Sequence, residues 1–455
     1  MPGKADWQEL FGLEYRQLYE EGYPVGSSYT PDWPSPYLPL PDQARKNVEI
    51  TEKSWESAYH NLWKIRTKGL REDFSFVEPD DYQRIIDDAG APPVLQKLDP
   101  VAYAERVKGA WFGRCAGVVL GKPFEMGLNR LQIMEYLESL DAYPLDDWPP
   151  LFSEKLGKGL RKDCLPSSRG KVQFVQPDDD THYTILALLL AEKKGLNFSG
   201  LDIGENLLEN IPYRWLWSAT GQAYYHLVNL TGDSPKEEQI SQLPIKINPW
   251  REGINGAIRG DFWGYISPGD PNRAAQLAHR FVSFNMVKNG LYGAMFVAGC
   301  ISAALTPNPS IENILNGGLS VIPKKSRLAS VIENVLTWYG SENDWIPVCD
   351  RIYKKYGHLG FSACLNNIAF IILSLVHGQL DYTRSITTAV MCGTDTDCTG
   401  GTVGSIVGAA VGYKKLDSKW VNPLNDRIKT AVASFGEGTI TGLANRTIAV
   451  RDSNP

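Results

Sequence analysis

The chain has 455 residues and a net charge of −6; 43% of its residues are hydrophobic and 22% are charged. This balance is typical of a globular protein with a substantial buried core. Its basic residues are spread along the chain and form no Lys/Arg-rich stretch, which argues against a nucleic-acid-binding surface.

The cysteines and the N-terminal sequence indicate the compartment. Seven cysteines are an odd number, and no two of them form a CxxC pair, which favours reduced thiols over a disulfide framework. The start, MPGKADWQELFG, lacks the basic stretch and apolar core of a secretion signal. The most apolar segments extend over about 15 residues, fewer than the ~20 that cross a bilayer. We expect a cytoplasmic protein that binds neither membranes nor nucleic acid.

The first hundred residues differ in pattern from the rest. Residues 1 to about 45 are rich in proline and aromatic residues (YPVGSSYTPDWPSPYLPLPD), which predicts an irregular segment lying on the protein surface. Helices are expected at 48–69 and near 80–89, and GAPP at 90–93 marks a boundary. We therefore divide the chain into an N-terminal extension, residues 1–100, and a helical domain, residues 101–455.

Apolar segments rich in small residues predict long helices in the second part of the chain. The clearest cover 103–119, 181–193, 290–305, 363–377 and 398–412. Several are apolar on all sides, which is typical of helices in the interior of a multi-layer helical domain. Strand signals are sparse, and the best is KVQFV at 171–175. The expected fold class is all-α.

One of these helices, CTGGTVGSIVGAAVG, carries glycines at a spacing of four residues. Gly400, Gly404 and Gly408 lie on one face, where they would let a neighbouring backbone approach closely.

Two acidic clusters stand directly before helices that have almost no polar residues. Asp178–Asp180 precede THYTILALLLAE, and Asp395 and Asp397 precede the glycine-rich helix, where an extended turn would point both side chains to one side. A helix N-terminus offsets only about 0.3–1 kcal/mol of negative charge, too little for five carboxylates. Mg²⁺ or Mn²⁺ would cancel the repulsion, because hard cations take oxygen ligands. From the residues alone, the aspartates could form a metal site or could be unrelated helix caps.

A third stretch, GAWFGRCAGVVLGKPFEMG at 109–127, is a small-residue helix that ends in Leu-Gly, with Glu125 just beyond it. Together the three stretches resemble the ADP-ribosylglycohydrolase family, which is related to dinitrogenase reductase-activating glycohydrolase. That family shows LGxPxE, [ST]DDT and GxDTD[TS] in this order, and the chain has LGKPFE, DDDT and GTDTDC. The resemblance runs from about residue 103 to 450 and looks like a bacterial-type branch. It implies a single large orthogonal bundle of helices behind the irregular extension.

The resemblance also implies a centre of two divalent cations, Mg²⁺ or alternatively Mn²⁺, that binds the ribose of an ADP-ribosyl group. Carried over by position, the metal ligands are Asp178, Asp179, Asp180, Asp395, Asp397 and Cys398. The chemistry is hydrolysis at ribose C1 through an oxocarbenium-like transition state. Asp179, Asp180 or Glu125 would transfer the proton, and the sequence does not rank them. Glu125, Gly121, His182 and Gly393 are assigned to substrate binding, with a packed histidine as the alternative for His182.

Four positions depart from the family pattern. Asp178 stands where Ser or Thr is usual, Cys398 where Thr is usual, Val118 where many members have Asp, and Met286 about where His is frequent. We favour a Cys398 thiol that packs in the helix, because sulfur is a poor ligand for Mg²⁺.

Because of these departures, the sequence does not determine the substrate. It does not determine the oligomeric state either. The protein could release ADP-ribose from a protein or a small conjugate, or it could cleave a free ribosyl or nucleoside-type N-glycoside. A third hypothesis is a non-catalytic binding or structural protein with the same fold. It would predict damaged acidic clusters, whereas all four family aspartates are present.

Overall fold

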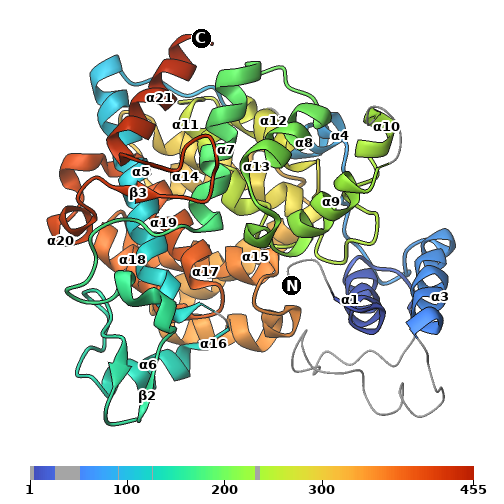
Figure 1. Cartoon of the computed structure of the whole chain (residues 1–455), viewed down its shortest axis with the longest axis horizontal. Helices are drawn as coiled ribbons and strands as arrows, with labels where there is room; N and C mark the ends of the chain where they lie inside the picture. Colours follow the sequence, from blue (N-terminus) through green and yellow to red (C-terminus); the bar gives the residue numbers. More distant parts are fainter. Residues whose placement is uncertain (1–4, 26–51, 91, 126, 231–235, 455) are drawn as a thin grey trace.

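The computed structural model of the chain describes residues 5–25, 52–90, 92–125, 127–230 and 236–454 (Figure 1). Helices dominate this part, and its strands form two short antiparallel pairs: β1 (Phe152–Ser153) with β2 (Lys158–Gly159), and β3 (Ile428–Lys429) with β4 (Glu437–Gly438). The predicted all-α fold is therefore confirmed.

The α-helices are α1 (Trp7–Glu20), α3 (Glu52–Trp63), α4 (Tyr82–Ala89), α5 (Pro100–Gly121), α6 (Arg130–Glu138), α7 (Asp179–Lys194), α8 (Gly200–Asn210), α9 (Ser218–Val228), α10 (Glu237–Ile240), α11 (Asp261–Tyr265), α12 (Pro271–Val282), α13 (Lys288–Ala304), α14 (Ile311–Leu319), α15 (Arg327–Glu342), α16 (Trp345–Tyr356), α17 (Cys364–Gly378), α18 (Tyr382–Cys392), α19 (Thr396–Val411), α20 (Ser418–Val421) and α21 (Ile440–Asp452). The five long helices predicted from the sequence correspond to α5, α7, α13, α17 and α19. In α13 every residue from Asn289 to Ala304 is buried, as its uniformly apolar sequence predicts.

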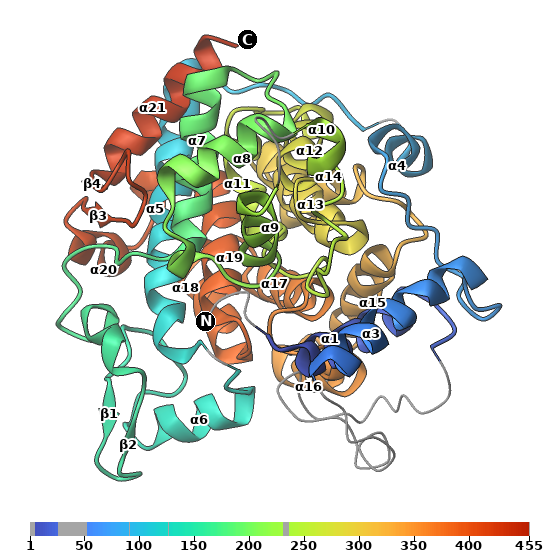
Figure 2. The same ribbon diagram turned by 45° about the vertical axis from the view of Figure 1, so that its right-hand side comes forward.

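Helices α5 and α19 form a closely packed pair in the domain (Figure 2). Their backbones touch along a line of small residues, where Gly109, Gly113, Gly117 and Gly121 face Gly408, Gly404, Gly400 and Thr396. A Cβ atom added at Gly117 would lie 2.1 Å from the carbonyl oxygen of Gly400, which leaves no room for any side chain. The predicted close approach at the glycine-rich helix is confirmed. It fixes where the last turn of α5 lies relative to the first turn of α19.

The N-terminal extension is less irregular than we expected. Helix α1 begins after Asp6, whose side chain accepts a hydrogen bond from the Glu9 N–H at 2.8 Å. Leu10, Leu13 and Leu18 are buried. The proline-rich composition after residue 23 led us to extend the irregular segment over this helix. Most of that proline-rich stretch lies outside the described residues.

The other local predictions had mixed outcomes. The helix expected at 48–69 is α3 followed by a 3₁₀ turn, Lys64–Lys68, and its first residues lie outside the described part. The helix expected near 80–89 is α4. The best strand signal, at 171–175, forms no strand, because in that segment only Val175 pairs, through a single parallel bridge to Ile428. Among the described helices, none combines the length and the apolar character needed to span a membrane.

Candidate metal centre

Three helix ends meet at one group of carboxylates. Helix α7 begins at Asp179 with Asp178 as its N-cap, and α19 begins at Thr396 directly after Asp395. Helix α5 ends at Gly121, and the 3₁₀ turn after it leads to Glu125. Both α7 and α19 begin two residues earlier than we predicted. Asp395 and Asp397 are therefore not alternate residues of an extended turn, because the second lies in the first turn of a helix.

The structure brings together acidic side chains from the three separate motifs. Potential ligand atoms lie within 4.8 Å of one another in three groups: Glu125, Asp395 and Asp397; Asp180, Asp397 and Cys398; and Asp178, Asp179 and Asp180. Because Asp397 and Asp180 each belong to two of these groups, the six carboxylates form one continuous cluster. We call this cluster the carboxylate centre.

Burial and mutual repulsion both oppose full ionisation of the carboxylate centre. Burial is the largest cause that raises the pKa of Asp179, Asp180 and Asp397 well above the usual range, and neighbouring carboxylates add to it. Burial, followed by Asp395 and Asp178, raises the pKa of Glu125 to about 7. Additional positive charge at this position would allow the acids to ionise together.

Sequence reasoning missed the basic side chains that reach the carboxylate centre. The Arg114 guanidinium donates to the Asp180 carbonyl oxygen at 2.7 Å, and it lies 3.3 Å from an Asp180 carboxylate oxygen. It is shared with the buried Asp261, whose Oδ1 lies 3.1 Å from Arg114 Nη1. Lys122 forms an ion pair with Asp178.

Arg161 is the third basic residue, and it pairs with both Glu125 and Asp163. A signal for Arg114 and Lys122 was present in the sequence, because a charged residue inside the apolar stretch 109–127 requires a buried partner. Arg161 follows no comparable pattern.

The donor chemistry of the centre fits a hard divalent cation. Among the described residues, six carboxylates face three basic groups, two of which also pair with acids outside the centre. The Cys398 thiol donates to Asp180 Oδ2 at 3.2 Å. Burial and the adjacent carboxylates raise the pKa of this thiol, so it stays protonated. The anionic donors are therefore oxygen atoms, which suit Mg²⁺ or Mn²⁺ better than a thiophilic metal.

The residues assigned to substrate binding lie in different surroundings. His182 is fully buried, and its Nε2 accepts a hydrogen bond from the Ala431 N–H at 3.0 Å, as the alternative of a packed histidine predicts. Burial lowers its pKa to about 4. Gly121 lies beside the centre, where its carbonyl oxygen accepts from the Thr396 hydroxyl at 2.7 Å. Gly393 has φ +84°, and a Cβ there would lie 2.4 Å from the Leu128 carbonyl oxygen.

Two of the departures from the family pattern are core residues. Val118 and Met286 are each 1% exposed. A Cβ at Gly401 would lie 2.6 Å from a methyl group of Val118, which places Val118 against α19. Both side chains therefore fill the interior of the helical domain.

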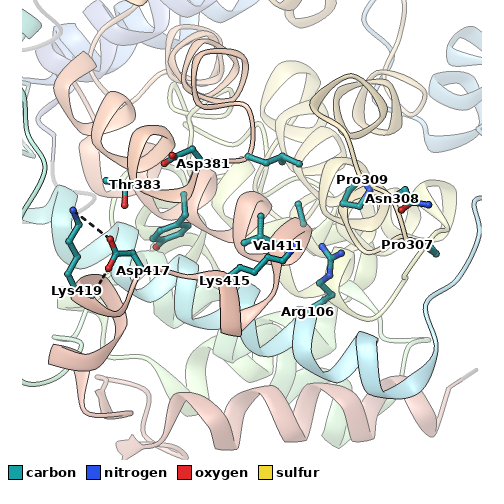
Figure 3. Close-up of a pocket in the computed structure, with 13 residues that line it drawn as sticks. Arg106, Pro307, Asn308, Pro309, Asp381, Thr383, Val411, Lys415, Asp417 and Lys419 are labelled. Carbon is teal, nitrogen blue, oxygen red and sulfur yellow. Dashed lines mark hydrogen bonds and ion pairs between the residues drawn. The ribbon is translucent and has the colours of Figure 1, made fainter.

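A large cavity lies at the C-terminal end of α19, and Figure 3 shows residues that line it. It has a volume of about 880 Å³ and is lined by the last turn of α19, the first part of α5 and the start of α18, with Arg106, Asp381, Lys415, Asp417 and Lys419 supplying its charges. Because α19 begins at the centre and ends at this cavity, the two are separated by the length of the helix.

A comparison with known protein families identifies the family of the chain. Residues 99–454 match the family described as ADP-ribosylglycohydrolase. The chain therefore belongs to the ADP-ribosylglycohydrolase family, a class of glycosidases. It is similar in structure to a chain of an "ADP-ribosylglycohydrolase-related protein complex", with 15% identity, a TM-score of 0.45, and coverage of 78% of this chain and 100% of the other. No curated protein sequence matches it.

Proposed function

We propose that the protein is a metal-dependent hydrolase that cleaves the glycosidic bond at ribose C1 of an ADP-ribosyl group. The observation that carries this proposal is the convergence of six carboxylates at three helix ends, with fewer basic groups than acids. Asp179, Asp180, Asp395 and Asp397 would hold two divalent cations, Mg²⁺ ahead of Mn²⁺. When bound, the cations supply positive charge for the ribose hydroxyls and lower the pKa of water.

Glu125 is better placed than Asp180 to transfer the proton. The Glu125 side chain is 23% exposed, whereas that of Asp180 is 1% exposed and is bonded to Arg114 and to the Cys398 thiol. A group that exchanges a proton with substrate must reach it, and its pKa should lie near the working pH. Glu125 meets the condition of reach, and in the absence of cations its pKa is raised to about 7. Asp179, which is half-buried, is the second candidate.

Two arginines would hold acids of the centre in position. Arg114 holds Asp180 from inside the domain through its backbone and its side chain. Arg161 is 33% exposed and holds Glu125 from the outer side. These contacts hold both acids in place, which favours a constant distance between them during turnover.

A release assay tests this proposal directly. Full-length protein is incubated with ADP-ribosylated protein and, separately, with a panel of nucleosides and other small ribosyl N-glycosides, in Mg²⁺, Mn²⁺ or EDTA. We expect release of ADP-ribose that depends on Mg²⁺ or Mn²⁺ and is lost in EDTA. If only the small glycosides are cleaved, the proposed ADP-ribosyl substrate is wrong, and the protein is a hydrolase of free ribosyl N-glycosides. Equal release in EDTA would contradict the metal dependence, and no release from any substrate would favour a non-catalytic role.

A further inference from the structure

Lys122 lies inside the carboxylate centre, at the turn where α5 ends. Its side chain is 11% exposed, and its ammonium group forms an ion pair with Asp178 and donates to the Pro177 carbonyl oxygen at 3.3 Å. Asp397 and Glu125 are the next carboxylates that act on it electrostatically. A buried ammonium group needs such partners, because it loses its hydration. The chain therefore contributes a permanent positive charge of its own to this cluster of acids.

Both carboxylate oxygens of Asp178 are engaged by protein donors. Oδ1 accepts a hydrogen bond from the Asp180 N–H at 3.0 Å, and Oδ2 accepts from Lys122. The adjacent Asp179 differs, since within the described residues its carboxylate accepts no hydrogen bond. Three consecutive aspartates thus have different surroundings: Asp178 is bonded to an N–H and an ammonium group, Asp180 to Arg114 and a thiol, and Asp179 is open toward the centre.

We propose that Lys122 is a fixed cation of the carboxylate centre, which neutralises Asp178, keeps it from coordinating a divalent cation, and sets how tightly the other carboxylates hold that cation. The inference rests on the proposed cation centre and refines it. In this account Asp178 pairs with Lys122 and caps α7, whereas Asp179, Asp395 and Asp397 remain cation ligands. Asp180 remains a ligand as well, because its Oδ2 accepts only from the neutral Cys398 thiol, which a cation can displace, and not from an ammonium group. Lys122 is a positioning residue, because it acts through Asp178 and through its charge.

Removing the charge should tighten cation binding. In Lys122→Gln the side chain stays polar and similar in length, but the unit charge that repels a divalent cation is lost, and the Mn²⁺ affinity should rise at least about tenfold. Lys122→Arg keeps the charge and should bind Mn²⁺ as the wild type does. In Asp178→Asn the ammonium group loses its partner and turns toward Asp397 and Glu125, so Mn²⁺ affinity should fall at least about tenfold. The double variant Lys122→Gln/Asp178→Asn removes opposite charges together and should return close to the wild-type affinity.

Calorimetric titration of the metal-free full chain with MnCl₂ measures these affinities without reference to activity. Lys193→Gln is the matched control: Lys193 lies in the last turn of α7, at the opposite end of that helix from Asp178, and pairs with the exposed Glu209 at 2.6 Å, so this variant loses the same charge far from the centre. Its Mn²⁺ affinity should equal that of the wild type. Circular dichroism and thermal melting confirm that each variant is folded. A crystal structure with Mn²⁺ bound should show Lys122 still bonded to Asp178 and no Asp178 oxygen coordinating the ion.

The outcomes separate this inference from the proposed function. If the wild type binds Mn²⁺ but Lys122→Gln binds it no more tightly, or an Asp178 oxygen coordinates the ion, the role of Lys122 is wrong and the cation centre stands. If the wild type and every variant fail to bind Mn²⁺ and Mg²⁺, the cation centre is wrong and the inference falls with it. Tighter binding in Lys122→Gln, unchanged binding in Lys122→Arg and in the control, and recovery in the double variant would support it.

Discussion

Two buried clusters of charged side chains in this protein are balanced in different ways. The first lies where α1 meets the helical domain and consists of Glu14, Glu21, Glu78, Glu252, Arg251, Arg327 and Lys288. Each carboxylate oxygen there lies within hydrogen-bond or ion-pair distance of a donor; Glu14, for example, accepts from Arg251 at 2.8 and 2.9 Å and from Tyr59 at 2.9 Å. We call it the extension network. The second cluster is the carboxylate centre.

The difference between the clusters separates a structural role from a binding role. Burial alone would raise the pKa of Glu21 and Glu78, but their ion pairs and hydrogen bonds, chiefly those with Arg251 and Arg327, together lower both pKa values. Within this network, burial still raises the pKa of Glu252, which lies next to Glu78 and Glu21. In the carboxylate centre burial raises the pKa of Asp179 and Asp397, because the described part of the chain supplies fewer basic groups than acids there. Acids whose counter-charge comes from the chain itself stabilise the fold. Acids without it are suited to bind a cation from solution.

The largest expected effect is on activity, from removing a carboxylate of the centre. Asp179→Ala and Asp397→Ala should each lower hydrolysis at least about a thousandfold, because each removes an anionic ligand of the proposed cations. Without divalent cations the free energy of unfolding should stay the same or increase, since repulsion between like charges is relieved. Steady-state kinetics and calorimetry with and without Mg²⁺ measure both effects. A severe loss of stability in metal-free protein for both variants would show that these residues are structural caps.

Breaking the extension network should instead lower the stability of the protein. Arg251→Met leaves Glu14 and Glu21 buried without their main partner, and unfolding should become easier by about 3–5 kcal/mol. Chemical denaturation monitored by circular dichroism measures this change. The control is Arg446→Met, which breaks a half-exposed pair with Glu192 at 2.5 Å and should cost at most about 1 kcal/mol. Similar losses in both variants would mean that the extension network stabilises no more than a surface ion pair.

A smaller effect should follow from acid pH. The folded-state pKa values of Glu21 and Glu78 lie below the usual value of 4.5, so their contribution to stability is present above about pH 4.5 and is lost as the pH falls through their folded-state values. We expect the free energy of unfolding to fall below pH 4.5, and α1 to become sensitive to protease there. Glu21→Gln should be less stable at pH 7 and should respond less to acid. An acid response identical to that of the wild type would contradict this assignment.

The sequence predicted the parts of the molecule that depend on local pattern. Uniformly apolar segments identified α13 and α17, and the glycine spacing at Gly400, Gly404 and Gly408 identified a close helix contact. The three acidic motifs identified the residues of the carboxylate centre, because their order matched one family. The predicted starts of α7 and α19 were two residues too late, because aspartates of DDDT and DTD belong to the first turns of these helices.

Contacts between distant residues could not be predicted in this way. Glu14 and Arg251 are 237 positions apart, and neither lies in a periodic pattern that indicates its partner. The pairing of Lys122 with Asp178 spans 56 positions, but the lone lysine in an apolar stretch was a signal that a buried acid lay nearby. The helix α1 was missed because proline-rich composition after residue 23 dominated the interpretation of the residues before it.

The contact between α5 and α19 also determines how late during synthesis the helical domain can finish folding. The Thr396 hydroxyl bonds the Gly121 carbonyl oxygen across 275 positions of sequence, so most of the helical domain is synthesised between the two helices. Contacts of such long range close large loops and form slowly during folding. Until α19 emerges, the glycine face of α5 has no partner. The acids of α7 and α19 can therefore meet only near the end of synthesis, which makes the carboxylate centre one of the last parts of the protein to assemble.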